Sequence, residues 1–272
     1  MTASPQNPHT SYVLSNSDPA ASGRFKALSA LFDSETIRHL QACGVREGWN
    51  CLEVGGGGGS ITTWLGHRVG PTGHVLVTDI DPRFLTGLAS HNVEVRQHNI
   101  VTDPLLDSSF DLIHARLVLI HIAERERVLP RLVAALKPGG WLVEEEFDSA
   151  SLLPDPSLFP GESLLDTQKA SMRLLDDRHV DRRWGRSLFA HMRTLGLEDV
   201  QAEGHLSMWH GGSSGTALMR ANFDELRSAI LEVGYVTSVQ FDADAARLED
   251  PSFFTPAPTM WTVYGRRPAP PT

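Results

Sequence analysis

Residues 52–60 read LEVGGGGGS, an acid within an apolar run followed by five consecutive glycines. Glycine reaches backbone angles that other residues resist, and without a side chain it lets a ligand lie against the main chain. A second apolar run, VLVTD at residues 75–79, closes on Asp79. A carboxylate in this place can accept hydrogen bonds from both hydroxyls of a ribose, as acids do in Rossmann-type sheets. The two motifs predict the nucleotide-binding half of a doubly wound α/β fold.

The alternation of predicted elements extends this pattern over the first half of the chain. Five apolar runs with helical segments between them predict a parallel sheet with right-handed crossovers. Strands are expected at Asn50–Val54, His74–Asp79, 93–96, 110–115 and 141–147, and helices at Ser60–Val69, 82–90 and 124–136. Before them, residues 25–32 and 36–40 have helical spacing, and Asp33 with Ser34 is expected to break the helix and cap its second part.

Beyond residue 148 the regular alternation stops. Helices are expected at 162–175, 186–195, 216–233 and 236–248, and strands at 200–209 and 259–265. We therefore predict four parts. They are an N-terminal helical lid over 1–48, a cofactor-binding core over 49–148, a helical lid insertion over 149–183, and a part over 184–272 that completes the sheet and carries a second helical insertion at about 213–250.

Composition narrows the classes of partner. The formal net charge of −9 argues against a nucleic-acid partner, which needs a basic surface. The two cysteines, Cys43 and Cys51, have neither metal-ligand spacing nor a disulfide framework, and no cluster of metal ligands is recognisable, so no metal is expected. The polar first 16 residues do not resemble a signal peptide, and no apolar run approaches the roughly 20 residues that cross a bilayer. We expect a cytoplasmic protein outside the membrane.

Five motifs in sequence order resemble those of class I S-adenosylmethionine-dependent methyltransferases. They are ExGxGxG at 53–59, TDIDP at 78–82, SFDLI at 109–113, VLIHI at 118–122 and LKPGG at 136–140. Flanking segments, among them YGRRP at 264–268, resemble a subset of bacterial small-molecule methyltransferases. The resemblance implies a Rossmann-like, doubly wound sheet of seven mostly parallel strands with an antiparallel last strand, plus helical lid insertions. S-adenosyl-L-methionine is the implied cofactor.

The resemblance also implies roles at the cofactor. Glu53 would orient the glycine turn and the methionine portion, while Gly55 and Gly57 would let the main chain approach the ligand. Asp79 would bind the ribose hydroxyls through charge-assisted hydrogen bonds, with Asp81 as the fallback in a shifted register.

Further cofactor contacts follow from the same resemblance. Where the family usually has an acid for the adenine amino group, this chain has Asn99, whose side-chain oxygen can accept the same hydrogen bond. Ile100 would donate its backbone N–H to the ring. Arg24 is a candidate partner for the methionine carboxylate, and with Tyr12 it would fold over the cofactor. The remaining implied contacts are Ile80, Ala115 and Arg116.

Dinucleotide binding is the nearest alternative, and the glycine spacing argues against it. That fingerprint is G-x-G-x-x-G/A. A reading that starts at Gly55 ends at Ser60, and readings from the next two glycines end at Ile61 and Thr62. No P-loop lysine follows the glycines either, which argues against nucleoside triphosphates.

The sequence thus predicts methyl transfer to an O, N or C acceptor on a small, partly aromatic or apolar molecule, with a role in secondary metabolism. Such transfer needs alignment above all, and a base only where the acceptor loses a proton. The alternative is a protein that binds the cofactor without methyl transfer, as a binding module or a cyclase-type catalyst. The oligomeric state stays open; exchange of the N-terminal helix between subunits would give a homodimer. Candidate bases are His121 and His179, then His205 and His210, and candidate pocket walls are Phe147, Trp209, Phe253 and Phe254.

Overall fold

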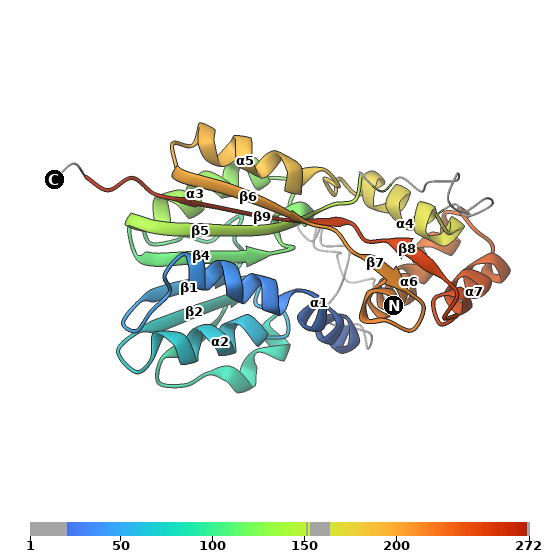
Figure 1. Cartoon of the computed structure of the whole chain (residues 1–272), viewed down its shortest axis with the longest axis horizontal. Helices are drawn as coiled ribbons and strands as arrows, with labels where there is room; N and C mark the ends of the chain where they lie inside the picture. The colour runs from blue at the N-terminus through green and yellow to red at the C-terminus, as the bar shows by residue number, and fades with distance from the viewer. Residues whose placement is uncertain (1–20, 151, 153–163, 271–272) are drawn as a thin grey trace, which may run out of the picture.

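The computed structural model describes residues 21–150, 152 and 164–270. Its centre is a seven-stranded sheet in the order β3-β2-β1-β4-β5-β9-β6 (Figure 1). The bounds are β1 Asn50–Val54, β2 His74–Asp79, β3 Val93–Gln97, β4 Phe110–Arg116, β5 Leu136–Asp148, β6 Glu198–His205 and β9 Thr259–Arg266. The first five strands pair in parallel, and β9 lies antiparallel between β5 and β6. The predicted Rossmann-like sheet with an antiparallel last strand is confirmed.

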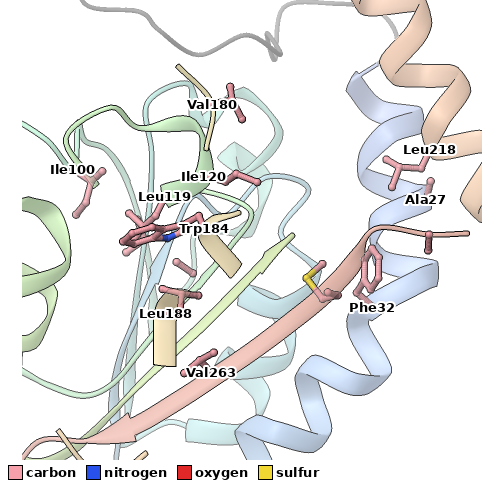
Figure 2. Packing of buried hydrophobic residues seen from close by; sticks show 14 of the residues in the cluster. Ala27, Phe32, Ile100, Leu119, Ile120, Val180, Trp184, Leu188, Leu218 and Val263 are labelled. Atoms are coloured by element: carbon pink, nitrogen blue, oxygen red, sulfur yellow. The ribbon is translucent and has the colours of Figure 1, made fainter. Parts of the chain in front are cut away.

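Helices cover both faces of this sheet because the strands are apolar on both sides. One hydrophobic cluster joins alternate strand residues to α1 (Ala21–Ala42) and α2 (Ser60–Val69). The other joins the intervening residues to α3 (Arg125–Ala135) and α5 (Trp184–Thr194). Figure 2 shows Trp184 of α5 among Leu119, Ile120 and Leu188 in this second cluster.

A group of smaller elements lies beyond the carboxyl ends of the parallel strands (Figure 1). It contains α4 (Asp166–Asp177), α6 (Ser214–Glu232), α7 (Ser238–Arg247) and a two-stranded sheet of β7 (Met208–His210) and β8 (Phe254–Pro256). The first half of α1 reaches into this group, where Ala27 lies beside Leu218 of α6 (Figure 2). We call α4, α6 and the amino-terminal half of α1 the cover. The four-part division of the chain stays a prediction.

The predicted break in the first helix is wrong, because α1 runs without interruption. Asp33 does not turn back to cap a new helix; its carboxylate accepts a hydrogen bond from Arg116 at 2.9 Å. The neighbouring Phe32 is buried and packs edge-on against Phe147. These tertiary contacts hold the helical conformation through a segment whose local sequence favours a cap.

The helix predicted at residues 82–90 is also wrong. The chain forms two 3-10 turns there, Pro82–Phe84 and Thr86–Leu88. Leu88 packs against the glycine turn so closely that a Cβ at Gly59 would lie 2.2 Å from its side chain.

The strand predicted at 200–209 is divided between two sheets. β6 ends at His205, which pairs with Met260. Because β6 and β9 are antiparallel and β9 begins at Thr259, β9 has almost no further residues with which β6 could pair. The chain then pairs again as β7, with β8. The length of β9 therefore sets where the predicted strand is interrupted.

Candidate active site

The glycine turn connects β1 to α2 at the carboxyl edge of the sheet. Gly55 and Gly57 have φ angles of +68° and +52°, a region that side chains other than glycine rarely adopt. The N–H of Gly55 donates to the Thr78 carbonyl at 2.7 Å, which ties the turn to the end of β2. A Cβ at Gly55 would lie 2.4 Å from Val118 Cγ2. The turn is therefore a position where only bare main chain fits.

Asp79 ends β2 and faces this turn. One carboxylate oxygen accepts the N–H of Gly57 at 3.2 Å, and the other accepts the N–H of Asp81 at 2.9 Å. Burial raises the pKa of Asp79 above its ordinary value, and the two N–H groups oppose that rise. Each oxygen has more than one acceptor site, so both can still bind a diol. Asp81 instead pairs with Arg83 at 2.8 Å and does not line the cavity described next.

A cavity of about 430 Å³ opens beside these groups, between the sheet edge and the cover. Its volume is that of a small-molecule site. It lies where the strand order reverses between β1 and β4, the place where doubly wound sheets bind ligands. The predicted site residues that line it are Arg24, Gly55, Gly57, Asp79, Ile80, Asn99, Ile100, Arg116 and His121.

Other predicted residues fall elsewhere. Ala115 is fully buried in the sheet, and Glu53 does not line the cavity because its carboxylate contacts His114. Tyr12 lies outside the described residues. His179 is exposed beyond α4, where its carbonyl accepts a hydrogen bond from Arg125 at 2.8 Å. His205, His210 and Phe254 are exposed and, like the buried Phe253, do not line the cavity, whereas Phe147 and Trp209 do.

The loop after β3 forms the end of the cavity where adenine is predicted to bind. The Asn99 side-chain oxygen accepts the N–H of Val101 at 3.0 Å, and its backbone N–H donates to Asp103 at 2.9 Å. This turn brings Ile100 to the wall of the cavity. Contact of Asn99 and Ile100 with adenine stays a prediction.

Two predicted arginines line the cavity while paired with carboxylates of the protein. Arg24 forms a buried ion pair with Glu225 of α6. Arg116 donates to Asp33 and to the hydroxyl of Thr36, each at 2.9 Å. These pairs join α1 to α6 and to β4 of the sheet. Binding of the methionine carboxylate by Arg24 stays a prediction.

A line of buried charge runs across the sheet behind the glycine turn. Glu53 and His114 are register partners on β1 and β4, and the Glu53 carboxylate lies 3.0 Å from His114 Nδ1. On the other side, His114 Nε2 lies 3.4 Å from Glu145 of β5. Glu145 also accepts hydrogen bonds from Thr36 and Thr262. The glycine turn is thereby linked to α1 through side chains of three adjoining strands.

The charges in this line support one another. His114 has no exposed surface, and burial alone would lower its pKa, but the two carboxylates raise the pKa of His114 to about 10. The imidazolium in turn lowers the pKa of Glu145 to about 2, against the effect of burial. The sequence carried a signal for this line, because Glu53, His114 and Glu145 are ionisable residues inside apolar strands.

The turn after β4 is held by Glu146, the next residue on β5. One of its carboxylate oxygens accepts the N–H groups of Val118, Leu119 and Ile120 at 3.1, 2.7 and 3.2 Å. Burial raises the pKa of Glu146 to about 8, although these three hydrogen bonds oppose the rise. The turn it holds carries the following residue, His121, into the cavity lining.

His121 is neutral at physiological pH. Burial, together with the positive charges of Arg24 and Arg125, lowers the pKa of His121 to about 4. A neutral imidazole at a cavity wall can accept a proton.

The half of the cavity that α4 and α6 line is mainly apolar. Helical spacing brings Met172 and Leu175 of α4 and Leu218, Met219 and Leu226 of α6 to its wall. No helix in the described ranges is long and apolar enough to span a membrane.

The residues present fit S-adenosylmethionine. Gly55 and Gly57 leave bare main chain at the cavity, and Asp79 presents a buried carboxylate for a ribose beside them. The strand order, this turn and the cavity at the switch point agree with the predicted resemblance to class I S-adenosylmethionine-dependent methyltransferases.

Comparison with known proteins agrees with this class. Residues 52–142 match the family model described as a methyltransferase domain. The ubiquinone/menaquinone biosynthesis C-methyltransferase UbiE of Enterobacter sp. (strain 638) is 28% identical over 180 residues, which are 60% of this chain and 71% of that protein. Other proteins of the same name match over 116 or 124 residues, 45% or 49% of their length. These matches favour methyl transfer over the alternative of a binding module or cyclase-type catalyst.

Solved structures share the fold at low identity. Phosphoethanolamine N-methyltransferase 2 of Haemonchus contortus, in complex with phosphomonomethylethanolamine and S-adenosylhomocysteine, is 14% identical with a TM-score of 0.56, covering 92% of this chain and 58% of that one. The [4+2]-cyclase SpnF is 17% identical with a TM-score of 0.55, covering 88% of this chain and 81% of that one. Since a cyclase and a methyltransferase both match, the assignment depends on the sequence relatives and the domain, not on the fold.

Proposed function

We propose that the protein transfers the methyl group of S-adenosylmethionine to a small, uncharged and mainly apolar molecule held under the cover. The observation that carries this proposal is the continuity of the cavity: the lining runs from Asp79 and the glycine turn directly into the apolar surface of α4 and α6. The name of the UbiE relatives supports a quinone-like ring and a carbon acceptor.

Bound S-adenosylmethionine supplies an electrophilic methyl group that is already activated. Asp79 and the glycine turn would fix the cofactor, and the cover would align the acceptor and exclude water from it. Alignment of this kind contributes on the order of 7–11 kcal/mol to intramolecular reactions. His121 would accept the proton that the acceptor loses.

The class of acceptor can be tested with an extract divided into a low-molecular-mass fraction and a macromolecular fraction. With methyl-labelled S-adenosylmethionine, we expect label in low-mass compounds that pass into organic solvent. The same extract without enzyme is the control. Label found only in protein or nucleic acid would contradict the proposal.

His121→Ala is expected to lower kcat by about 10²–10⁴-fold, the usual contribution of a general base. Because His121 is not expected to hold the cofactor, affinity for S-adenosylhomocysteine should stay within about twofold, well inside the roughly 1.4 kcal/mol of a tenfold change. The wild-type rate should fall as the pH decreases through about 4, where the imidazole becomes protonated. Steady-state kinetics measures kcat and its pH dependence, and calorimetry measures the affinity for S-adenosylhomocysteine. His67→Ala, an exposed histidine on α2, is the matched control; an unchanged kcat in His121→Ala would remove the base assignment.

A further inference from the structure

The apolar cover contains two amide side chains that face the cavity. Gln168 lines it from α4 and Asn222 lines it from α6. Gln168 is only 5% exposed. The Gln168 Oε1 and Asn222 Oδ1 atoms are buried and accept no hydrogen bond from any residue in the described ranges. A buried acceptor without a donor costs free energy, which a donor on a ligand would recover.

The helix neighbours of the two amides do not supply this donor. Ser171 lies one turn after Gln168 on the same face, but its hydroxyl donates to the Thr167 carbonyl at 2.8 Å. The neighbours of Asn222 on the cavity side of α6 are Leu218, Met219, Phe223 and Leu226. The amides are therefore polar points in a mainly apolar wall, the pattern by which binding pockets select orientation.

Burial limits which chemical groups of a ligand can donate a hydrogen bond to these two amide oxygens. An ammonium group would lose its hydration in this apolar half of the cavity and find amides in place of a carboxylate, which is costly. A neutral hydroxyl can donate to an amide oxygen at little cost. Trp209 adds a buried indole N–H without an acceptor among the described residues, and it also lines the cavity. A hydroxyl has one donor and can also accept, so it can donate to one of the two amide oxygens and accept from the Trp209 indole.

We propose that Gln168 and Asn222 are specificity-determining residues whose side-chain oxygens accept hydrogen bonds from hydroxyl groups of the methyl acceptor. The acceptor class is then a hydroxylated, otherwise apolar ring compound. This inference rests on the proposed function, because it places the acceptor in the apolar half of the same cavity.

Calorimetry on the full chain saturated with S-adenosylhomocysteine tests it, with 2-naphthol, naphthalene and 2-methoxynaphthalene as probes. We expect 2-naphthol to bind about 3- to 10-fold more tightly than the other two, the effect of one or two neutral hydrogen bonds. In Gln168→Leu and Asn222→Leu this preference should shrink, and in the double variant it should disappear, while affinity for naphthalene is kept. Gln41→Leu, an exposed glutamine at the far end of α1, is the matched control.

Thermal unfolding without probe separates recognition from a structural role. Removing an unpartnered buried amide should leave Tm unchanged or higher in Gln168→Leu. A large fall in Tm would show that Gln168 has a partner inside the protein and would overturn the inference. Equal affinity of wild type for 2-naphthol and naphthalene, or no binding of any probe, would do the same. Failure to bind S-adenosylhomocysteine would instead overturn the proposed function.

Discussion

His114→Gln is expected to lower the free energy of unfolding by about 3–5 kcal/mol, the usual cost of removing one partner from a buried ion pair. The substitution leaves Glu53 and Glu145 buried without the imidazolium that lies between them. Glutamine can still donate a hydrogen bond, so the loss measures mainly the charge. Urea unfolding at neutral pH gives the difference.

The pH dependence of the same variant provides a second measurement. In the folded protein the pKa of His114 is raised to about 10, whereas an unfolded histidine has a pKa of about 6.5. Between these values the folded state holds a proton that the unfolded state has released. Stability from this group is therefore complete below pH of about 6.5 and is lost as the pH rises through about 10, at up to about 1.4 kcal/mol per pH unit.

We accordingly expect the difference between wild type and His114→Gln to narrow as the pH rises from 7 to 10. His74→Gln is the control, because His74 lies 3.6 Å from Glu94 in a pair that is more than two-fifths exposed on both sides. Exposed ion pairs contribute little to the free energy of unfolding. A His114 variant as stable as the His74 variant would show that the buried histidine carries no charge.

Asp79→Ala is expected to weaken binding of S-adenosylhomocysteine by about 1.5–3 kcal/mol, roughly 10- to 150-fold, the scale of hydrogen bonds to a charged group. The carboxylate lies at the cavity wall beside Gly57, where bare main chain leaves room for a ribose. Because burial raises the pKa of Asp79, wild-type affinity should also fall on acidification before an exposed aspartate would be protonated. Calorimetry at several pH values measures both effects.

Asp81→Ala is the matched control for Asp79. Asp81 lies two residues further along, pairs with Arg83 and does not line the cavity. Its N–H, which supports Asp79, is kept in the variant. We expect affinity close to wild type. A loss in Asp81→Ala with none in Asp79→Ala would mean that the ribose site lies one register away.

Local spacing was sufficient to predict the glycine turn and Asp79, because both belong to a single strand-turn-helix unit and its neighbouring strand. The Glu53–His114–Glu145 line could not be predicted in the same way. Its members are 61 and 31 residues apart and meet only because β4 lies between β1 and β5 in register. Strand order is a property of the whole sheet, so the ionisable residues inside apolar strands indicated buried charge without indicating a partner.

The sequence predicted the helices of the cover, but not the cavity surface that they form together. Helical spacing on α4 and α6 indicates an apolar face for each, yet the cavity exists only because the two helices meet beyond the end of the sheet. Gln168 and Asn222 would each pass for an ordinary polar residue in an isolated helix. For the same reason His179 and His121 looked alike in the sequence, whereas the fold exposes one and places the other at the cavity wall.

Because α1 is one uninterrupted helix, it connects the cover directly to the sheet. Its amino-terminal half belongs to the cover through the ion pair of Arg24 with Glu225, and its carboxyl-terminal half is bound to the core through Arg116 and Thr36. Under the proposed function, substitutions along α4 and α6 would change the acceptor site without disturbing the glycine turn. An α6 taken from a relative without an acid at position 225 would, however, remove the carboxylate that pairs with the buried Arg24. We therefore expect positions 24 and 225 to change together when this helix is exchanged.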